Sequence, residues 1–95
     1  MSLHDKALRA GKLAGVIFDF DEVGDVLPMH KHGVNDVHIT IVARGSFRAH
    51  GPGWERMISA GDVLDWAVDQ YHEFIATAPN SRLVNVIKGG GSNNA

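Results

Sequence analysis

The fold of this chain is decided in one stretch, from Gly24 to Gly45, which reads GDVLPMHKHGVNDVHITIVARG. It contains three of the six histidines, His30, His32 and His38. On an extended strand, residues two apart point to the same face, so we expect His30 and His32 to project together. His38 follows a polar break and begins an apolar run, which as the next strand would return it beside the first pair. Three converging imidazoles predict a metal site.

The rest of the chain alternates short β-rich segments with turn signals. Gly, Pro, Asn and Asp separate these segments, and we find no convincing helical periodicity over about twelve residues. Short strands with closely spaced turns are typical of an all-β sandwich or barrel. The expected strands are residues 14–20, 26–32, 37–43, 47–50, 54–58, 63–68, 71–77 and 82–88.

The 95 residues are enough for one domain with a single core. We expect an N-terminal arm at residues 1–13, one barrel domain at residues 14–88 and a flexible polar tail at residues 89–95. The arm contains enough apolar residues for one short helical turn ended by Gly11, although an ordered arm fits equally well.

Composition excludes several classes of function. The net charge of −2, with interspersed signs, provides neither a nucleic-acid-binding surface nor a basic membrane-binding face. No apolar run approaches the roughly 18 residues that span a bilayer, and no signal peptide is visible. Because the chain has no cysteine, any metal must be held by histidine, carboxylate or water. These features predict a cytoplasmic protein.

The stretch that contains the three histidines resembles the first motif of the cupin superfamily, in particular the small single-domain cupins with a conserved barrel. That motif usually reads Gly, five residues, His-x-His, three or four residues, Glu, six residues, Gly. In this chain Gly24 is followed after five residues by His30 and His32, and six residues separate His38 from Gly45. His38 therefore stands where the family has glutamate, after a longer intervening loop.

A later segment resembles the second cupin motif, which usually reads Gly, five residues, Pro, one residue, Gly, two residues, His, three residues, Asn. Here Gly61 and His72 match the first glycine and the histidine at the family's spacing. Ala67, Asp69 and Ala76 replace the proline, the second glycine and the asparagine. Together the two motifs cover nearly all of the chain that is expected to fold.

The resemblance implies a jelly-roll β-barrel with a metal bound by His30, His32 and His72. Counting back from Gly45 makes His38 the fourth ligand. Counting forward from His32 puts Asp36 or Val37 at that position, and Asp36 is the alternative ligand. One divalent transition metal per chain is expected, whether Fe, Ni, Zn, Cu or Mn. Four neutral imidazoles would leave the full charge of the ion uncompensated, which favours an anionic ligand, a bound hydroxide or an enolate.

Three functions fit such a site. The first is a dioxygenase-type metalloenzyme that acts on a small anionic or enolisable molecule. The second is a non-catalytic module that binds a small ligand or uses the metal structurally, and the third is a metal-dependent isomerase. One fold hosts all three, so the sequence identifies no catalytic residue. The expected partners are a small-molecule ligand and a second copy of the chain, since open sheet edges need covering.

Several other residues are open to two interpretations. Asp65 is a candidate general base if Val63 faces inward, because the two share a strand face, and is otherwise a solvent-side charge. We expect His50 to face solvent and attach little functional weight to His4. Four aromatic residues could line a pocket or fill the core or an interface: Phe47, Trp54, Trp66 and Tyr71. Four arginines are expected to be solvated or paired with acids: Arg44, Arg48, Arg56 and Arg82.

Overall fold

The structure is a computed structural model that describes residues 3–10, 13–30, 36–66 and 71–89. For residues 10, 13, 30, 36–38 and 87–89 it describes the backbone and not the side chain. Every regular element in this part of the chain is a β-strand, and none of it forms a helix that could cross a membrane. The strands are β1 (Leu3–Ala10), β2 (Leu13–Phe20), β3 (Val26–His30), β4 (Asp36–Arg44), β5 (Ser46–Gly51), β6 (Trp54–Ser59), β7 (Val63–Asp65), β8 (His72–Ala76) and β9 (Ser81–Gly89).

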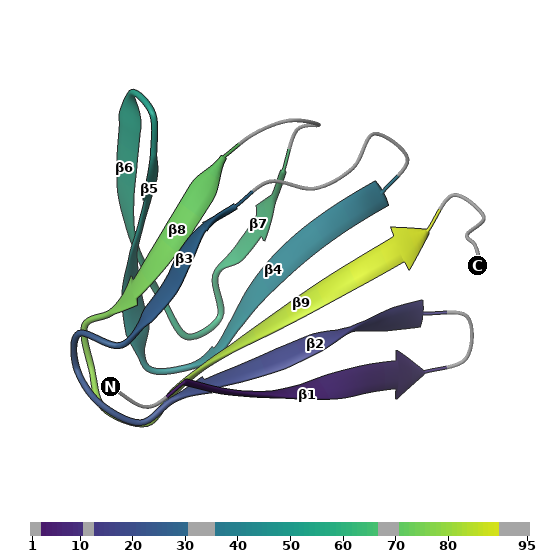
Figure 1. Cartoon of the computed structure of the whole chain (residues 1–95), viewed down its shortest axis with the longest axis horizontal. Coiled ribbons are helices and arrows are strands. Elements are labelled where there is room, and N and C mark those ends of the chain that lie inside the picture. Colours follow the sequence, from purple (N-terminus) through teal and green to yellow (C-terminus); the bar gives the residue numbers. More distant parts are fainter. Residues whose placement is uncertain (1–2, 11–12, 31–35, 67–70, 90–95) are drawn as a thin grey trace.

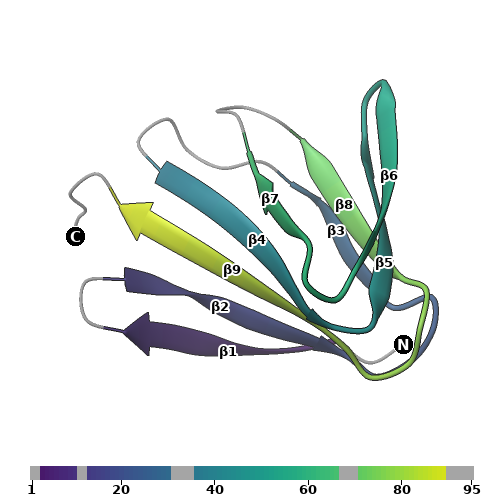
Figure 2. The same ribbon diagram turned by 180° about the vertical axis from the view of Figure 1, so that it is seen from behind.

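The strands form two antiparallel sheets that face each other (Figure 1). The larger sheet has the order β1-β2-β9-β4-β7 and the smaller sheet the order β3-β8-β5-β6. The sheets converge where β2 leads to β3, β4 to β5 and β8 to β9, and we call this the closed end. They diverge toward the opposite, open end, as the view from behind also shows (Figure 2). At the open end β3 ends and both β4 and β8 begin, so the open end holds the strand ends that carry candidate ligands.

The predicted all-β jelly roll is confirmed, but residues 3–10 do not form a helical turn. They form β1, which pairs with β2 along its whole length, from Leu3 opposite Phe20 to Ala10 opposite Leu13. Pairing with an existing sheet supplies the hydrogen bonds that a single helical turn could not sustain alone. The exposed edge of β1 carries several charged side chains, which disfavour edge-to-edge association.

Three phenylalanines form the centre of the core between the sheets. Phe47 on β5 contacts Phe20 edge to face, with ring centroids 4.8 Å apart, and Phe74 at 6.4 Å. All three rings are fully buried. The remaining buried apolar residues surround them from both sheets: Val42, Ala49, Ile58, Leu64, Ala76 and Leu83.

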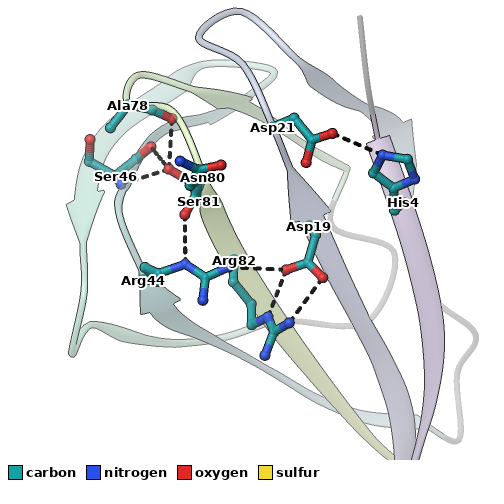
Figure 3. Close-up of polar contacts among 9 residues, drawn as sticks. All are labelled: His4, Asp19, Asp21, Arg44, Ser46, Ala78, Asn80, Ser81 and Arg82. Atoms are coloured by element: carbon teal, nitrogen blue, oxygen red, sulfur yellow. Dashed lines mark hydrogen bonds and ion pairs between the residues drawn. The ribbon is translucent and has the colours of Figure 1, made fainter.

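Polar contacts join the strands of the larger sheet at the closed end (Figure 3). Asp19 on β2 accepts two hydrogen bonds from Arg82 on β9, at 2.6 Å from Nε and 3.0 Å from Nη2. Arg44 at the end of β4 donates from Nε to the backbone oxygen of Asn80 at 2.7 Å, and its Nη2 lies 3.6 Å from Asp19. The expectation that arginines pair with acids is confirmed at these two positions.

These contacts predict a loss of stability in acid. The hydrogen bonds from Arg82, and the positive charges of Arg82, Arg44 and Lys6, hold the pKa of Asp19 below its ordinary value of 3.8 despite partial burial. A carboxyl group whose pKa is lowered by folding stabilises the protein above its unfolded-state pKa, and this contribution is lost as pH falls through the folded-state pKa. For a partly exposed pair we expect Asp19→Asn to cost about 1 kcal/mol at pH 7. In urea titrations this cost should shrink steadily below pH 4, and a cost independent of pH would contradict the assignment.

Gly45 lies in the turn between β4 and β5, where the backbone passes close to Ser81 at the closed end. Its φ of +79° lies in the left-handed region, and a Cβ there would overlap the side chain of Ser81. Ser81 is fully buried and donates from Oγ to the backbone oxygen of Ala78 at 2.8 Å, so it has little freedom to move. Gly53 has the same φ, but nothing lies within 4 Å of the position its Cβ would take.

The two glycines therefore form a matched pair. We expect Gly53→Ala to cost about 1 kcal/mol from backbone strain alone. Gly45→Ala should cost about 2–4 kcal/mol, because overpacking against Ser81 adds to the same strain. Urea unfolding midpoints of the two variants measure the difference, and equal costs would show that Ser81 does not constrain the turn.

Candidate metal centre

His72 is the first residue of β8, and its imidazole lies in the interior at 0% exposure. The burial follows from the alternation of the strand, which places His72, Phe74 and Ala76 in the interior. Glu73 and Ile75, which alternate with them, are only partly buried. A histidine at an interior position of an otherwise apolar strand face requires polar or aromatic neighbours.

The indole ring of Trp66 covers one face of the His72 imidazole. The ring centroids are 4.1 Å apart and the planes are inclined by only 16°. Trp66, which follows β7, also donates a hydrogen bond from Nε1 to Oγ1 of Thr40 on β4 at 2.8 Å. Thr40 in turn donates to Oδ1 of Asn85 on β9 at 2.7 Å. A continuous chain of contacts therefore runs from His72 on the smaller sheet to β9 on the larger sheet.

The strand register brings two of the predicted ligand positions together. After a register shift between Leu27 and His30, His30 at the end of β3 pairs with His72 at the start of β8. His38 lies on the facing sheet, two residues before the buried Thr40 on β4. His32 lies outside the described residues.

The donor set fits a transition metal by its chemistry. Neutral imidazole suits Fe, Ni, Cu and Zn better than it suits Mg or Ca. Among the described side chains, no three histidines, aspartates or glutamates gather as metal ligands. That description includes His72 but not the side chains of His30, His38 or Asp36.

Asp65 is not in the interior. Leu64 is the buried residue of β7, at 5% exposure, whereas Val63 is 58% exposed and Asp65 lies on the same exposed face. The interpretation of Asp65 as a general base beside the metal is therefore wrong, and the alternative of a solvent-side charge is confirmed.

The four candidate pocket aromatics have different surroundings. Phe47 belongs to the core, and Tyr71 is 43% exposed. Trp54 and Trp66 are partly buried against the core, with centroids 5.7 Å apart. Of the four, Trp66 is the one whose ring stacks on His72.

The two remaining histidines lie away from the interior. His50 on β5 lies opposite Glu73, with 2.6 Å between Nε2 and Oε1, a distance typical of an ion pair but without hydrogen-bond alignment. Its side chain is 23% exposed, so it is less open to solvent than we expected. His4 on β1 contacts Asp21 at 3.0 Å at the surface (Figure 3).

The sequence analysis missed two interior residues, Thr40 and Asn85. They are 0% and 3% exposed and lie opposite each other on β4 and β9. Each is the polar residue in the middle of an otherwise apolar strand, and this was the signal that could have identified them. A polar side chain at a buried strand position needs a hydrogen-bond partner, which here is the other member of the pair.

Two facing antiparallel sheets with an interior histidine define the cupin type of jelly roll, and comparison with solved structures confirms this fold. KdgF from Halomonas sp. is 24% identical with a TM-score of 0.79, and the match covers 95% of this chain and 81% of that chain. A predicted oxalate decarboxylase from Thermotoga maritima is 20% identical with a TM-score of 0.78, over 92% of this chain and 80% of that one.

A cupin 2 conserved barrel domain protein from Salinispora arenicola has a TM-score of 0.73 at 20% identity, over 90% of this chain and 74% of that chain. No protein-family model and no curated protein sequence matches the chain. The likeness is thus one of fold, and function must be argued from the residues of the interior.

Proposed function

We propose that this chain is a metal-binding cupin that holds one divalent transition metal through His30, His32, His38 and His72. The observation that carries the proposal is the register of β3 and β8, in which His30 lies directly opposite the buried His72. Residues directly opposite each other on antiparallel strands share a face of the sheet. The register therefore supports a ligand set built around this pair.

Two residues at the start of β4, Asp36 and His38, are candidates for the fourth ligand. They are two residues apart and so share the alternation that leads to the buried Thr40. We propose His38, which is closer to Thr40 along the strand. Comparing the metal affinities of His38→Ala and Asp36→Ala decides between them. The residue whose replacement lowers the affinity is the ligand, and the residue whose replacement leaves it unchanged is not.

We propose that the site binds a small anionic or enolisable molecule. When bound, a divalent metal held by four neutral imidazoles supplies an uncompensated positive charge and acts as a Lewis acid. Among the described residues, the buried carboxylate is that of Asp25, which accepts a hydrogen bond from the Glu22 backbone N–H in the turn before β3, at the closed end. No described carboxylate lies in the interior beside His72. Dioxygenase-type cleavage of a metal-held ligand is the first reaction to test, and a metal-dependent isomerase, in which the metal would act as the Lewis acid, is the alternative.

Elemental analysis of the protein, purified without a polyhistidine tag, tests the metal site. We expect about one transition metal per chain as purified or after reconstitution, and less than about a tenth of that would overturn the proposal. The His4→Ala and His50→Ala variants are matched controls that should keep the metal, because the structure places both histidines away from the interior. Oxygen uptake by the iron-loaded protein with diketones, flavonols and thiols then separates an oxygenase from a non-catalytic binding module.

We also propose that a second copy of the chain covers the outer face of the larger sheet. One row of aliphatic side chains runs across four of its strands, formed by Ile17, Val84, Ile41 and Val63. A second, neighbouring row contains Leu8, Val86 and Ile39, with Gly15 paired between Leu8 and Val86. The exposed charges of Lys6 and Asp65 lie at opposite edges, on β1 and β7. A two-fold axis along the strands would bring Lys6 of one copy near Asp65 of the other, which selects a second copy as the occupant.

Light scattering tests this dimer. We expect a dimer for the natural chain and a monomer for Ile41→Glu, because a buried carboxylate at the centre of the face would be unpaired. Met57→Glu is the control, since Met57 is 60% exposed on the smaller sheet and should leave the dimer intact. A monomeric natural chain, or a dimeric Ile41→Glu chain, would overturn the proposal.

A further inference from the structure

The contacts of Trp66 fix its position from both sides. On one side its indole ring stacks on His72, with 4.1 Å between centroids. On the other side its Nε1–H is held by Thr40, and Thr40 is held by Asn85. These residues come from the segment after β7 and from β8, β4 and β9, so the chain of contacts joins four separate parts of the fold.

The chemistry of the groups sets the direction of each hydrogen bond. An indole N–H can only donate, so the Thr40 hydroxyl must accept from Trp66. The hydroxyl hydrogen of Thr40 is then available for the amide oxygen of Asn85, in agreement with the 2.7 Å separation. Each group in the series Trp66, Thr40, Asn85 therefore has one defined role, and the indole plane cannot turn without breaking the hydrogen bond to Thr40.

Stability alone does not require these polar groups. Replacing both partners of a buried hydrogen bond by apolar groups of similar shape is often nearly neutral for folding, whereas removing one partner is costly. A valine at position 40, a leucine at position 85 and a phenylalanine at position 66 would satisfy the same strand pattern and leave none of the three groups without a partner. What the polar pair adds is a fixed orientation for Trp66, and through it for the face of the His72 ring.

We infer that Trp66 is a positioning residue for His72, held in place by Thr40 and Asn85. This inference rests on the proposed role of His72 as a metal ligand. Residues that orient a metal-bound histidine typically change metal affinity by about 10- to 100-fold when they are altered. By covering one face of the imidazole, Trp66 prevents the His72 ring from tilting out of its present plane. The nitrogen lone pair that would bind a metal lies in this ring plane.

Metal affinity, measured by competition with a chelator, tests the inference. We expect Trp66→Phe to weaken Co²⁺ and Zn²⁺ binding by about tenfold, because phenylalanine keeps a ring but loses the bond to Thr40. Trp54→Phe is the matched control, since the ring of Trp54 lies 5.7 Å from that of Trp66, whereas the ring that stacks on His72 is that of Trp66. We expect it to bind metal like the natural chain.

A second pair of variants keeps the test decisive if Trp66→Phe does not fold. Thr40→Val, which has nearly the same shape but no hydroxyl, should weaken binding by a similar factor. Thr40→Ser restores the hydroxyl and should restore the affinity. Urea unfolding of the metal-free proteins shows whether any loss of affinity exceeds the loss of stability.

Tryptophan fluorescence gives an independent signal, because the chain has two tryptophans. In Trp54→Phe the remaining emission comes from Trp66, and we expect Co²⁺ to quench most of it. In Trp66→Phe it comes from Trp54, and quenching should be weaker at equal occupancy. If the natural chain binds no metal, the proposed function fails. If it binds metal and the Trp66 and Thr40 variants bind equally well, with equal quenching of both tryptophans, the inference about Trp66 alone is overturned.

Discussion

Metal affinity is expected to fall by about 100-fold or more when His72 is replaced by alanine, because the change removes a ligand and exceeds the effect of altering a neighbouring residue. Burial is the physical reason for so large an effect. The His72 imidazole is 0% exposed and stacked beneath Trp66, so neither water nor a surface side chain can easily take its place. Chelator competition measures the affinity directly.

The lower metal affinity of His72→Ala should also reduce the free energy by which metal stabilises the folded protein. A ligand that binds only the folded state stabilises it by about 2.7 kcal/mol at a concentration 100 times its Kd. We expect this increment in urea titrations of the natural chain and its absence from His72→Ala at the same metal concentration. His72→Gln, which keeps most of the volume, separates the loss of a ligand from the cavity left by alanine. A His72→Ala chain that retained the full increment would remove His72 from the ligand set.

The control for this prediction is His50→Ala, on the neighbouring strand. His50 is partly exposed and lies against Glu73, on the side of β8 that alternates with the buried face of His72. We expect its removal to leave the metal increment unchanged. Equal losses in His50→Ala and His72→Ala would show a general effect of removing histidines rather than a defined site.

Most of the fold could be predicted from the sequence because its signals are local. Turn residues separate the strands, and Gly24, Gly45 and Gly61, the motif glycines, all adopt positive φ at 92°, 79° and 99°. A glycine at a positive φ is favoured for a reason contained in one residue, its missing Cβ. The strand β1 was missed because its first apolar residue, Leu3, and its few companions form no clear period of two.

The site could be predicted only in part, because its geometry depends on residues far apart in the chain. The spacing from Gly61 identified His72 as a candidate metal ligand, and the structure shows that its imidazole is buried. The stacking of Trp66 on that ring and its bond to Thr40 join segments 6 and 26 residues apart, and no local pattern encodes which aromatic residue meets which strand. Polar residues inside apolar strands are a general signal for such contacts, but they do not name their partners.

The largest loss of stability is expected for Phe47→Ala. Phe47 is fully buried and contacts both Phe20 and Phe74, so its removal leaves a cavity between the two sheets. A buried phenylalanine replaced by alanine typically costs about 3–5 kcal/mol. A domain of this size has about 5–14 kcal/mol of stability in total, so at least about a fifth of it should be lost. Urea or thermal unfolding measures the cost.

Two controls and one consequence make this prediction specific. Phe47→Leu, which retains most of the volume, should cost about 1.5 kcal/mol or less, and Met57→Ala on the exposed side of the adjoining strand should cost within about 0.5 kcal/mol. A Phe47→Ala cost below that of Phe47→Leu would contradict the position of this ring at the centre of the core. Phe47 and His72 share the neighbour Phe74, whose ring centroid lies 6.4 Å from that of Phe47 and 5.8 Å from that of His72, so we expect changes at the two positions to be coupled. The stabilisation by metal should therefore be reduced more in Phe47→Ala than in Phe47→Leu, because leucine retains most of the contact with Phe74.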